Sequence, residues 1–264
     1  MQYDCHVEVF DPVRWCHSET PDQPMAIVAT VTHLKPFLRA SKVRAPVFVQ
    51  PLAYRGSHGC LLNALQTTGA HARAVGHLSM HVPGVEIEAL HRRGVRGTRF
   101  VMDEQALLDD LLDDLAAIHQ LLPAVWHIEL SGPRRQLFKL AAKLAHWNRN
   151  FVGVATDMWK EDWCALEAAR VLWWMEMGNL YLKLVLPSQT MLAQAVAKLQ
   201  PSMAKMIPVA ADRLLWGSGW PHTASGRVHN LQFDRCHRTP AGFAHTLDAN
   251  ARAVYGFADA SSLR

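Results

Sequence analysis

Short runs of β-branched and aromatic residues alternate along this chain with longer segments whose apolar residues recur every three or four positions. Eight short runs have the composition of strands: Tyr3–Phe10, Ala45–Gln50, Ala72–Leu78, Gly94–Val101, Val125–Leu130, Phe151–Thr156, Leu180–Leu186 and Arg213–Ser218. The clearest helical periodicities follow later in the chain: Asp103–Leu122, Gln136–Trp147, Glu161–Met177, Gln189–Lys205 and Pro240–Tyr255. The pattern predicts an alternating α/β fold.

Strands that alternate with helices predict a parallel sheet, because parallel neighbours need a crossover connection. An open doubly wound sheet and a closed barrel both satisfy this rule. The count of eight favours the barrel, as does the lack of a GxGxxG loop after the first strand. The length of 264 residues fits one barrel, which needs about 250. We therefore predict a single distorted (β/α)8 TIM-type barrel domain over residues 1–264.

Composition and charge exclude several classes of protein. Half of the residues are hydrophobic and 19% are charged, which suits a large core. The net charge is +4, but the basic residues are scattered, and Arg92-Arg93 and Arg134-Arg135 are the densest pairs. A nucleic-acid surface needs a basic stripe or patch, so we expect no nucleic-acid partner. No apolar run approaches about 18 residues, so we expect no membrane span.

The five cysteines, at positions 5, 16, 60, 164 and 236, are odd in number and form no CxxC pair. They are typical of reduced thiols. Met1–Asp4 has neither the basic nor the apolar region of a secretory signal, so we expect a cytoplasmic protein. The segment Glu161–Met177 is apolar almost all round, which favours packing against a neighbouring element or a second subunit of a homo-oligomer.

In a barrel the active site lies at the carboxyl ends of the strands, so polar residues there are candidates. His6 and Glu8 lie two apart on the first strand and face the same side. Such a pair can bind a metal or join a base to the group that orients it. A hydrogen-bonded pair in the core is the alternative, and spacing alone favours it. His77 ends the third strand, where it is either a site residue or a structural residue of the core.

Further candidates follow on later strands. Glu129 lies two residues after His127, and an inward carboxylate needs a partner. Arg99 ends the fourth strand, where it could hold a substrate carboxylate or form a surface ion pair. Asp157 is a helix N-cap or a site residue. Ser218 lies between two glycines, but the sequence G-S-G-W-P departs from the G-x-S-x-G of a nucleophile elbow.

Several of these segments together resemble the amidohydrolase-related (amidohydrolase 2) family, and within it the 2-pyrone-4,6-dicarboxylate lactonase-like group. The opening D-C-H-V-E-V-F-D-P at positions 4–12 resembles the family's D-x-H-x-H-x-F-D-P. In order along the chain, GVRGTRF (94–100), LYLKLVL (180–186), RLLWGSGWPH (213–222) and NARAVYGF (250–257) are similar to other segments of that group. The matches cover almost the whole chain.

The resemblance implies a distorted barrel of hydrolases and decarboxylases. In the lactonase-like group it implies a reaction without metal, with histidines that polarise the ester carbonyl and arginines that hold substrate carboxylates. On this chain those roles fall to His6, His222 and Arg99. The chain departs from the pattern where Glu8 replaces the second histidine, Thr156 replaces a strand-six histidine, and Gly219 replaces the strand-eight aspartate that activates water.

A glycine cannot take a proton from water, so another carboxylate must serve as the base. One histidine and one glutamate also make a poor zinc site, which normally has three protein ligands. The first hypothesis is a metal-independent hydrolase of an anionic lactone, ester or related small molecule, without a cofactor. His6, Glu8 and His222 would be catalytic, and Arg99, His77, Glu129, Thr156, Asp157 and Ser218 would bind the substrate. The alternatives are a lyase, decarboxylase, isomerase or cyclase in the same cavity, and a non-catalytic binding barrel.

Overall fold

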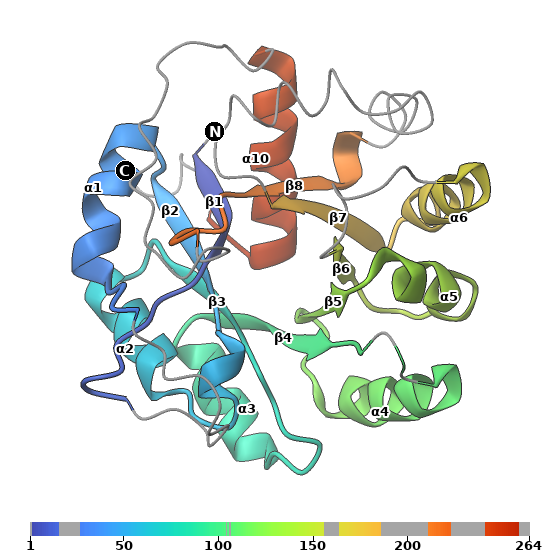
Figure 1. The fold of residues 1–264 in the computed structure, drawn as a ribbon, viewed down its shortest axis with the longest axis horizontal. Coiled ribbons are helices and arrows are strands. Elements are labelled where there is room, and N and C mark those ends of the chain that lie inside the picture. Colours follow the sequence, from blue (N-terminus) through green and yellow to red (C-terminus); the bar gives the residue numbers. More distant parts are fainter. Residues whose placement is uncertain are drawn as a thin grey trace.

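The computed structural model describes residues 2–15, 27–103, 105, 107–155, 164–185, 211–222 and 241–258. Eight parallel strands follow one another around a nearly closed barrel in the order β1 to β8 (Figure 1). Their bounds are β1 Tyr3–Val7, β2 Ala45–Val49, β3 Arg73–Gly76, β4 Val95–Val101, β5 His127–Gly132, β6 Phe151–Ala155, β7 Leu180–Val185 and β8 Leu214–Gly217. The predicted (β/α)8 architecture is confirmed.

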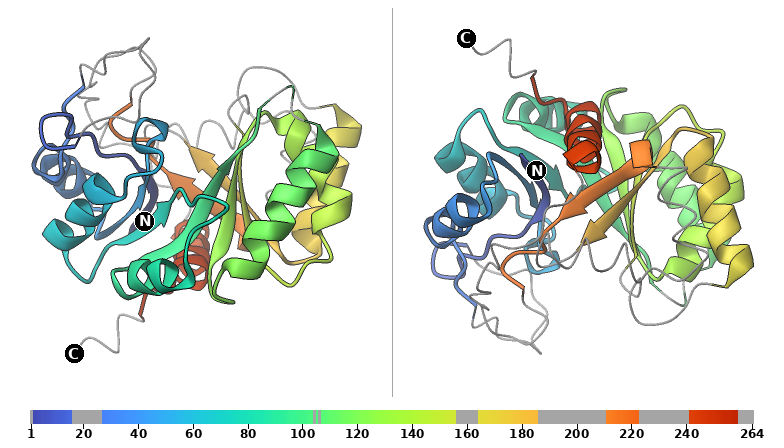
Figure 2. Two further views of the ribbon diagram at one scale, coloured as in Figure 1. Left: turned by 90° about the horizontal axis from the view of Figure 1, so that it is seen from below. Right: turned by 90° about the horizontal axis from the view of Figure 1, so that it is seen from above.

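Helices cover the outside of the strands. They are α1 Val31–Ser41, α2 Gly59–Thr68, α3 Gly84–Arg92, α4 Leu108–Leu121, α5 Arg134–Leu144, α6 Ala165–Glu176 and α10 Ala241–Tyr255, with short 3-10 turns at Leu52–Tyr54 and Ala211–Arg213. The helices α1 to α3 lie on one side of the strands and α4 to α6 on the other (Figure 2). Helix α10 packs against β8 and β1, where the first and last strands meet.

Alternation along the strands separates two apolar layers. Val47 and Val49 of β2 belong to the same buried cluster as Val152 and Leu215 from distant strands, which places these side chains inside the barrel. The residue between the two valines, Phe48, belongs instead to the larger layer between strands and helices. Successive side chains of a strand point to opposite faces, so one strand supplies both layers. Polar residues in register with the inner layer therefore point into the barrel.

The barrel closes through a short contact between β1 and the segment 217–220, which we call the seam. Val7 and Trp220 form an isolated parallel bridge. The Glu8 amide donates to the Trp220 carbonyl at 2.8 Å, and the Gly219 amide donates to the His6 carbonyl at 2.9 Å. These backbone bonds fix the height at which β8 meets the end of β1.

A buried carboxylate and a glycine complete the seam. Asp4 Oδ1 accepts hydrogen bonds from the amides of Ser218 at 2.8 Å and His6 at 3.1 Å. A Cβ atom on Gly217 would lie 2.3 Å from the Cβ of His6, closer than real atoms approach. Only a glycine therefore allows β8 to lie this near to His6.

The predicted strands all exist, but several bounds differ. The strand predicted at Tyr3–Phe10 ends at Val7. Beyond it, the Glu8 amide donates to the Trp220 carbonyl in the seam. The helix predicted from Asp103 begins at Leu108, with Asp109 and Asp110 in its first turn, where the helix dipole favours acids. The helix predicted at Gln189–Lys205 lies outside the described residues. None of the described helices is both long and apolar enough for a bilayer.

Candidate active site

Four charged side chains form an alternating chain inside the barrel, which we call the carboxyl-end cluster: Glu8, Arg99, Glu129 and Lys183. Arg99 Nη1 lies 3.0 Å from Glu8 Oε1, and Arg99 Nε lies 3.7 Å from Glu129 Oε1. Lys183 Nζ lies 2.5 Å from Glu129 Oε2. The strand register places Arg99 directly beside Glu129. Residues far apart in the sequence thus share one polar site.

Burial differs along the cluster. The side chains of Glu129 and Lys183 are fully buried, whereas those of Arg99 and Glu8 are 11% and 20% exposed. Each cation has a carboxylate partner, which burial of charge requires. Arg99 Nη2 also donates to Ser131 Oγ at 3.0 Å. Glu8 is therefore the member of the cluster that solvent or a ligand reaches most easily.

The hydrogen bond and ion pairs of Glu8 leave one oxygen available. Both Arg99 Nη1 and His6 Nε2, which is 3.9 Å away, lie near Oε1. Oε2 has no hydrogen-bond or ion-pair partner among the described side chains. A carboxylate oxygen in this position can accept a proton.

Two buried histidines line the same end of the barrel. Burial and the positive charges of Lys183 and Arg99 hold the pKa of His6 well below its usual value of 6.5. Burial, with Arg99 beside it, lowers the pKa of His77 to about 3. His6 Nδ1 and His77 Nε2 have no hydrogen-bond partner within the described part of the chain. Both rings are neutral at neutral pH, and each can offer a hydrogen bond to a polar ligand.

His127, the neighbour of Glu129 by sequence, lies deeper in the barrel. Its ring meets Tyr255 edge-on, with centroids 5.0 Å apart. Burial lowers the pKa of His127 to about 3. A Cβ on Gly97 would come within 2.6 Å of this ring, so the neighbouring strand makes room for it. His127 thus fills the core below the cluster.

Ser218 belongs to the seam. It is 1% exposed, and its hydroxyl accepts a hydrogen bond from the Trp220 amide at 3.0 Å. Its own amide donates to Asp4, whose pKa burial raises to about 6. Ser218 therefore stabilises the seam through its amide and its hydroxyl. Its predicted contact with the substrate stays a prediction.

Two departures from the family pattern meet in space. Gly219, at the position of the expected aspartate, has φ of +70°, a conformation that other residues rarely adopt. A Cβ there would lie 2.8 Å from Cγ1 of Val185; the resemblance implies a serine at position 185, in a segment V-Y-V-K-L-S that corresponds to LYLKLV here. Backbone and neighbour both oppose an aspartate at position 219. In this chain an apolar side chain therefore lies at this corner, where a carboxylate at position 219 would be strained.

The remaining predicted site residues are placed less fully. His222 follows the seam with φ of +63°, and its ring centroid lies 5.9 Å from that of Phe37. Thr156 and Asp157 lie outside the described residues.

Sequence reasoning missed Lys183 and Ser131 as members of the site. A lone lysine in the apolar run LYLKLVL was the available signal, because a buried ammonium requires a carboxylate.

The described residues do not suit a metal ion. Among them, no three or more His, Cys, Asp or Glu side chains are grouped so that they could hold one. In the cluster, the partners of Glu8 and Glu129 are Arg99 and Lys183, cations that compete with a metal for the carboxylates. We therefore derive no step through a metal.

No protein-family profile matches the chain. A 2-pyrone-4,6-dicarboxylate hydrolase of Comamonas testosteroni is 23% identical over 202 residues, which are 67% of this chain and 62% of that protein. The chain thus matches less than two thirds of the length of this relative. The similarity confirms the resemblance that the sequence motifs indicate.

Solved structures show the same fold. A structure from Acinetobacter baumannii, assigned as a 2-pyrone-4,6-dicarboxylic acid hydrolase and containing citric acid, has a TM-score of 0.67 and 19% identity. It covers 97% of this chain and 93% of its own. A Burkholderia multivorans amidohydrolase with bound zinc has a TM-score of 0.60 and 19% identity, covering 99% and 94%. These neighbours agree with the prediction of an amidohydrolase-like barrel.

Proposed function

We propose that this chain is a metal-independent hydrolase of a small lactone or ester that carries a carboxylate, with Glu8 as the general base. The pairing of Glu8 with Arg99 across the barrel carries the proposal. It places a partly exposed carboxylate beside a cation and two neutral histidines at the end of the barrel where active sites lie.

The anionic nature of the substrate rests on Arg99. Its guanidinium is 11% exposed and holds a carboxylate already, that of Glu8. Guanidinium groups bind carboxylates through parallel hydrogen bonds, so a substrate carboxylate can compete for the same nitrogen. The named relatives support this class of substrate, since one is a dicarboxylate hydrolase and one neighbour contains citric acid.

The competition for Arg99 suggests how the base is activated. When a substrate carboxylate takes Nη1, Glu8 loses this hydrogen bond, and its carboxylate becomes free to accept a proton. Glu8 then takes a proton from water as the water oxygen bonds to the substrate carbonyl carbon. His6 and His77 donate hydrogen bonds to the carbonyl oxygen, with His222 as a further predicted donor. The bond to the leaving oxygen breaks, and that oxygen receives the proton from Glu8.

A lyase or decarboxylase on the same scaffold is the second candidate. The contact between Val185 and position 219 favours it, because this corner lacks the carboxylate expected to activate water. Turnover in ¹⁸O-labelled water separates the two candidates. A hydrolase incorporates the label into the product acid, whereas a lyase product remains unlabelled.

The deciding experiment measures turnover of carboxylated lactones and aryl esters by the wild type, Glu8→Gln and Glu8→Asp. We expect Glu8→Gln to lower kcat by about 10²- to 10⁴-fold, the usual contribution of a general base. Glu8→Asp should retain part of the activity. Glu88→Gln, on the exposed face of α3, is the matched control. A Glu8→Gln enzyme with wild-type turnover contradicts the assignment.

Chelator treatment tests the metal-free part of the proposal separately. We expect turnover to persist in excess chelator and purified protein to contain no stoichiometric metal by mass spectrometry. Loss of activity on chelation, with recovery on adding zinc, would instead assign the reaction to a metal.

A further inference from the structure

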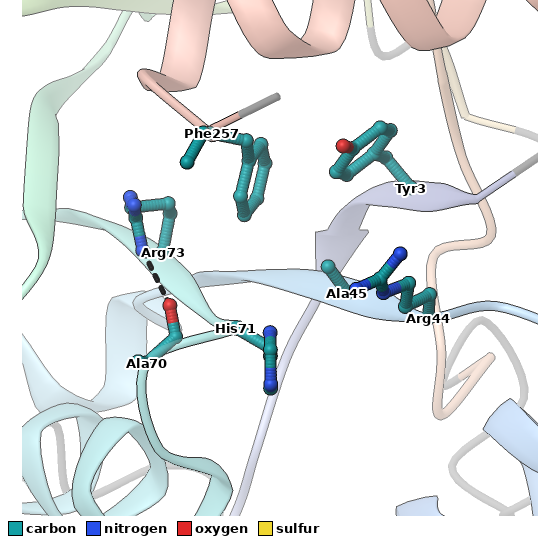
Figure 3. Close-up of a pocket in the computed structure, with 8 residues that line it drawn as sticks. Tyr3, Arg44, Ala45, Ala70, His71, Arg73 and Phe257 are labelled. Carbon is teal, nitrogen blue, oxygen red and sulfur yellow. Dashed lines mark hydrogen bonds between the residues drawn. The ribbon is translucent and has the colours of Figure 1, made fainter. Parts of the chain in front are cut away.

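A cavity of about 210 Å³ opens at the amino end of the barrel, opposite the carboxyl-end cluster. Tyr3, Ala45 and Arg73, which begin β1, β2 and β3, line it together with Arg44, His71 and Phe257 (Figure 3). Drug-sized ligands occupy about 300–1,000 Å³. This basal cavity therefore suits a smaller molecule.

Arg73 is a cation without an anionic partner in the described structure. Its guanidinium donates to the carbonyls of Ala70 at 2.9 Å, Ala72 at 2.9 Å and Gly256 at 3.0 Å. Its Nε is buried and has no acceptor among the described residues. Burial lowers the pKa of Arg73.

Two further basic side chains lie on the rim. Arg44 and His71 are exposed and border the cavity on the side away from Phe257 (Figure 3). Within the described ranges, neither Arg44 nor Arg73 forms an ion pair with an acid. As far as the described residues go, an anion in the cavity would therefore meet positive charge that no acid compensates.

The other wall of the cavity is aromatic. The rings of Tyr3 and Phe257 are 4.6 Å apart at an angle of 32°. The Arg73 guanidinium lies 5.0 Å above the Phe257 ring, a cation–π geometry that holds it in place. A flat apolar group can pack against this wall while an attached anion meets the arginines.

We propose that the basal cavity binds a small aromatic carboxylate, with its carboxylate between Arg44 and Arg73 and its ring against Tyr3 and Phe257. The combination of a small volume, an aromatic wall and uncompensated guanidinium charge selects this chemistry. The site is separate from the proposed catalytic end, and its ligand need not be the substrate.

The test is titration of the full chain with benzoate, followed by calorimetry, in the wild type, Arg44→Gln and Arg73→Gln. Loss of one charge-assisted contact should raise the Kd for benzoate by about tenfold or more. Arg92→Gln, an exposed arginine on α3, is the matched control and should leave the Kd unchanged. Inorganic phosphate should bind more weakly than benzoate, because it lacks the ring.

Glu8→Gln should also leave benzoate binding unchanged, which separates this site from the proposed catalytic end. Absence of benzoate binding at millimolar concentration overturns the proposal, as does a Kd that is unaffected in both arginine variants. Equal affinity for phosphate overturns its aromatic part. Arg73 also donates to three backbone carbonyls, so a thermal melt must show that Arg73→Gln remains folded. Arg44→Gln tests the binding of the carboxylate independently of these bonds.

Discussion

The carboxyl-end cluster and the basal cavity differ in how their positive charges are paired. At the carboxyl end, Arg99 and Lys183 are each paired with a glutamate. At the amino end, Arg44 and Arg73 have no acidic partner in the described part of the chain, and Arg96 donates only to His91 and the Val95 carbonyl. Arginine thus pairs with acids at the carboxyl end, whereas these arginines at the amino end have no described acidic partner.

Paired and unpaired charges have different chemical uses. Paired charges hold one another in fixed positions, as pre-organised sites require, and they have little net attraction for a distant ion. Unpaired guanidinium groups attract anions and are stabilised when one binds. The carboxyl end is therefore built for orientation, and the amino end for capture of an anion.

The largest expected effect comes from breaking the pairing at the carboxyl end. Lys183→Met leaves the fully buried Glu129 without its nearest cation. Loss of one partner of a buried ion pair costs about 3–5 kcal/mol in the free energy of unfolding. Urea denaturation followed by circular dichroism measures this loss. The double variant Lys183→Met with Glu129→Gln should recover part of it, and equal stability of the single variant and wild type would contradict the pairing.

The next effect concerns pH, because three buried histidines are neutral in the fold. The pKa of His6 lies well below 6.5, and those of His77 and His127 are about 3. Unfolding lets all three take up protons below about pH 6.5, so stability falls as pH falls. Asp4 opposes this trend, since its folded pKa of about 6 makes the fold bind a proton that the unfolded chain lacks.

These four groups together give a net uptake of about two protons on unfolding near pH 5, which corresponds to a loss of about 2.7 kcal/mol from pH 6 to pH 5. Urea titrations at several pH values measure it. Asp4→Asn should make the pH dependence steeper, because it removes the opposing group. Stability that rises between pH 6 and pH 5 would show that the histidines are protonated in the fold.

The smallest effect is expected at the amino end. Arg44 is exposed and forms no ion pair with a described acid, so Arg44→Gln should change the free energy of unfolding by no more than about 0.5 kcal/mol. The matched variant Arg99→Gln removes a paired guanidinium and should cost several times more. Thermal melts of the two variants make the comparison, which fails if both lose equal stability.

The sequence predicts the fold better than it predicts the site. Each strand carries its own signal in local composition, and all eight were found. Helices α1 and α2 have weaker signals, since α1 contains Pro36 and α2 carries polar residues such as Asn63 and Gln66. Such short helices depend on packing against the strands more than on their own propensity.

The contacts of the site depend on residues far apart in the chain. His6 and Glu8 share one side of a strand, as spacing predicts, but the pairing of Glu8 with Arg99 joins positions 91 residues apart. Arg99 was expected to hold a substrate carboxylate, and in the structure it holds Glu8. The basal cavity has no sequence signal, because Tyr3, Arg73 and Phe257 meet only once the barrel has formed.

The glycine at position 217 links assembly of the barrel to its proposed activity. Because β8 can lie against His6 only through this glycine, the joint between the first and last strands is also the one that sets His6 and Glu8 in place. A chain whose first and last strands have not met lacks the arrangement of His6 and Glu8 on which the proposed activity depends. We therefore expect a change that weakens this joint to lower the proposed activity, because it would displace His6 and Glu8.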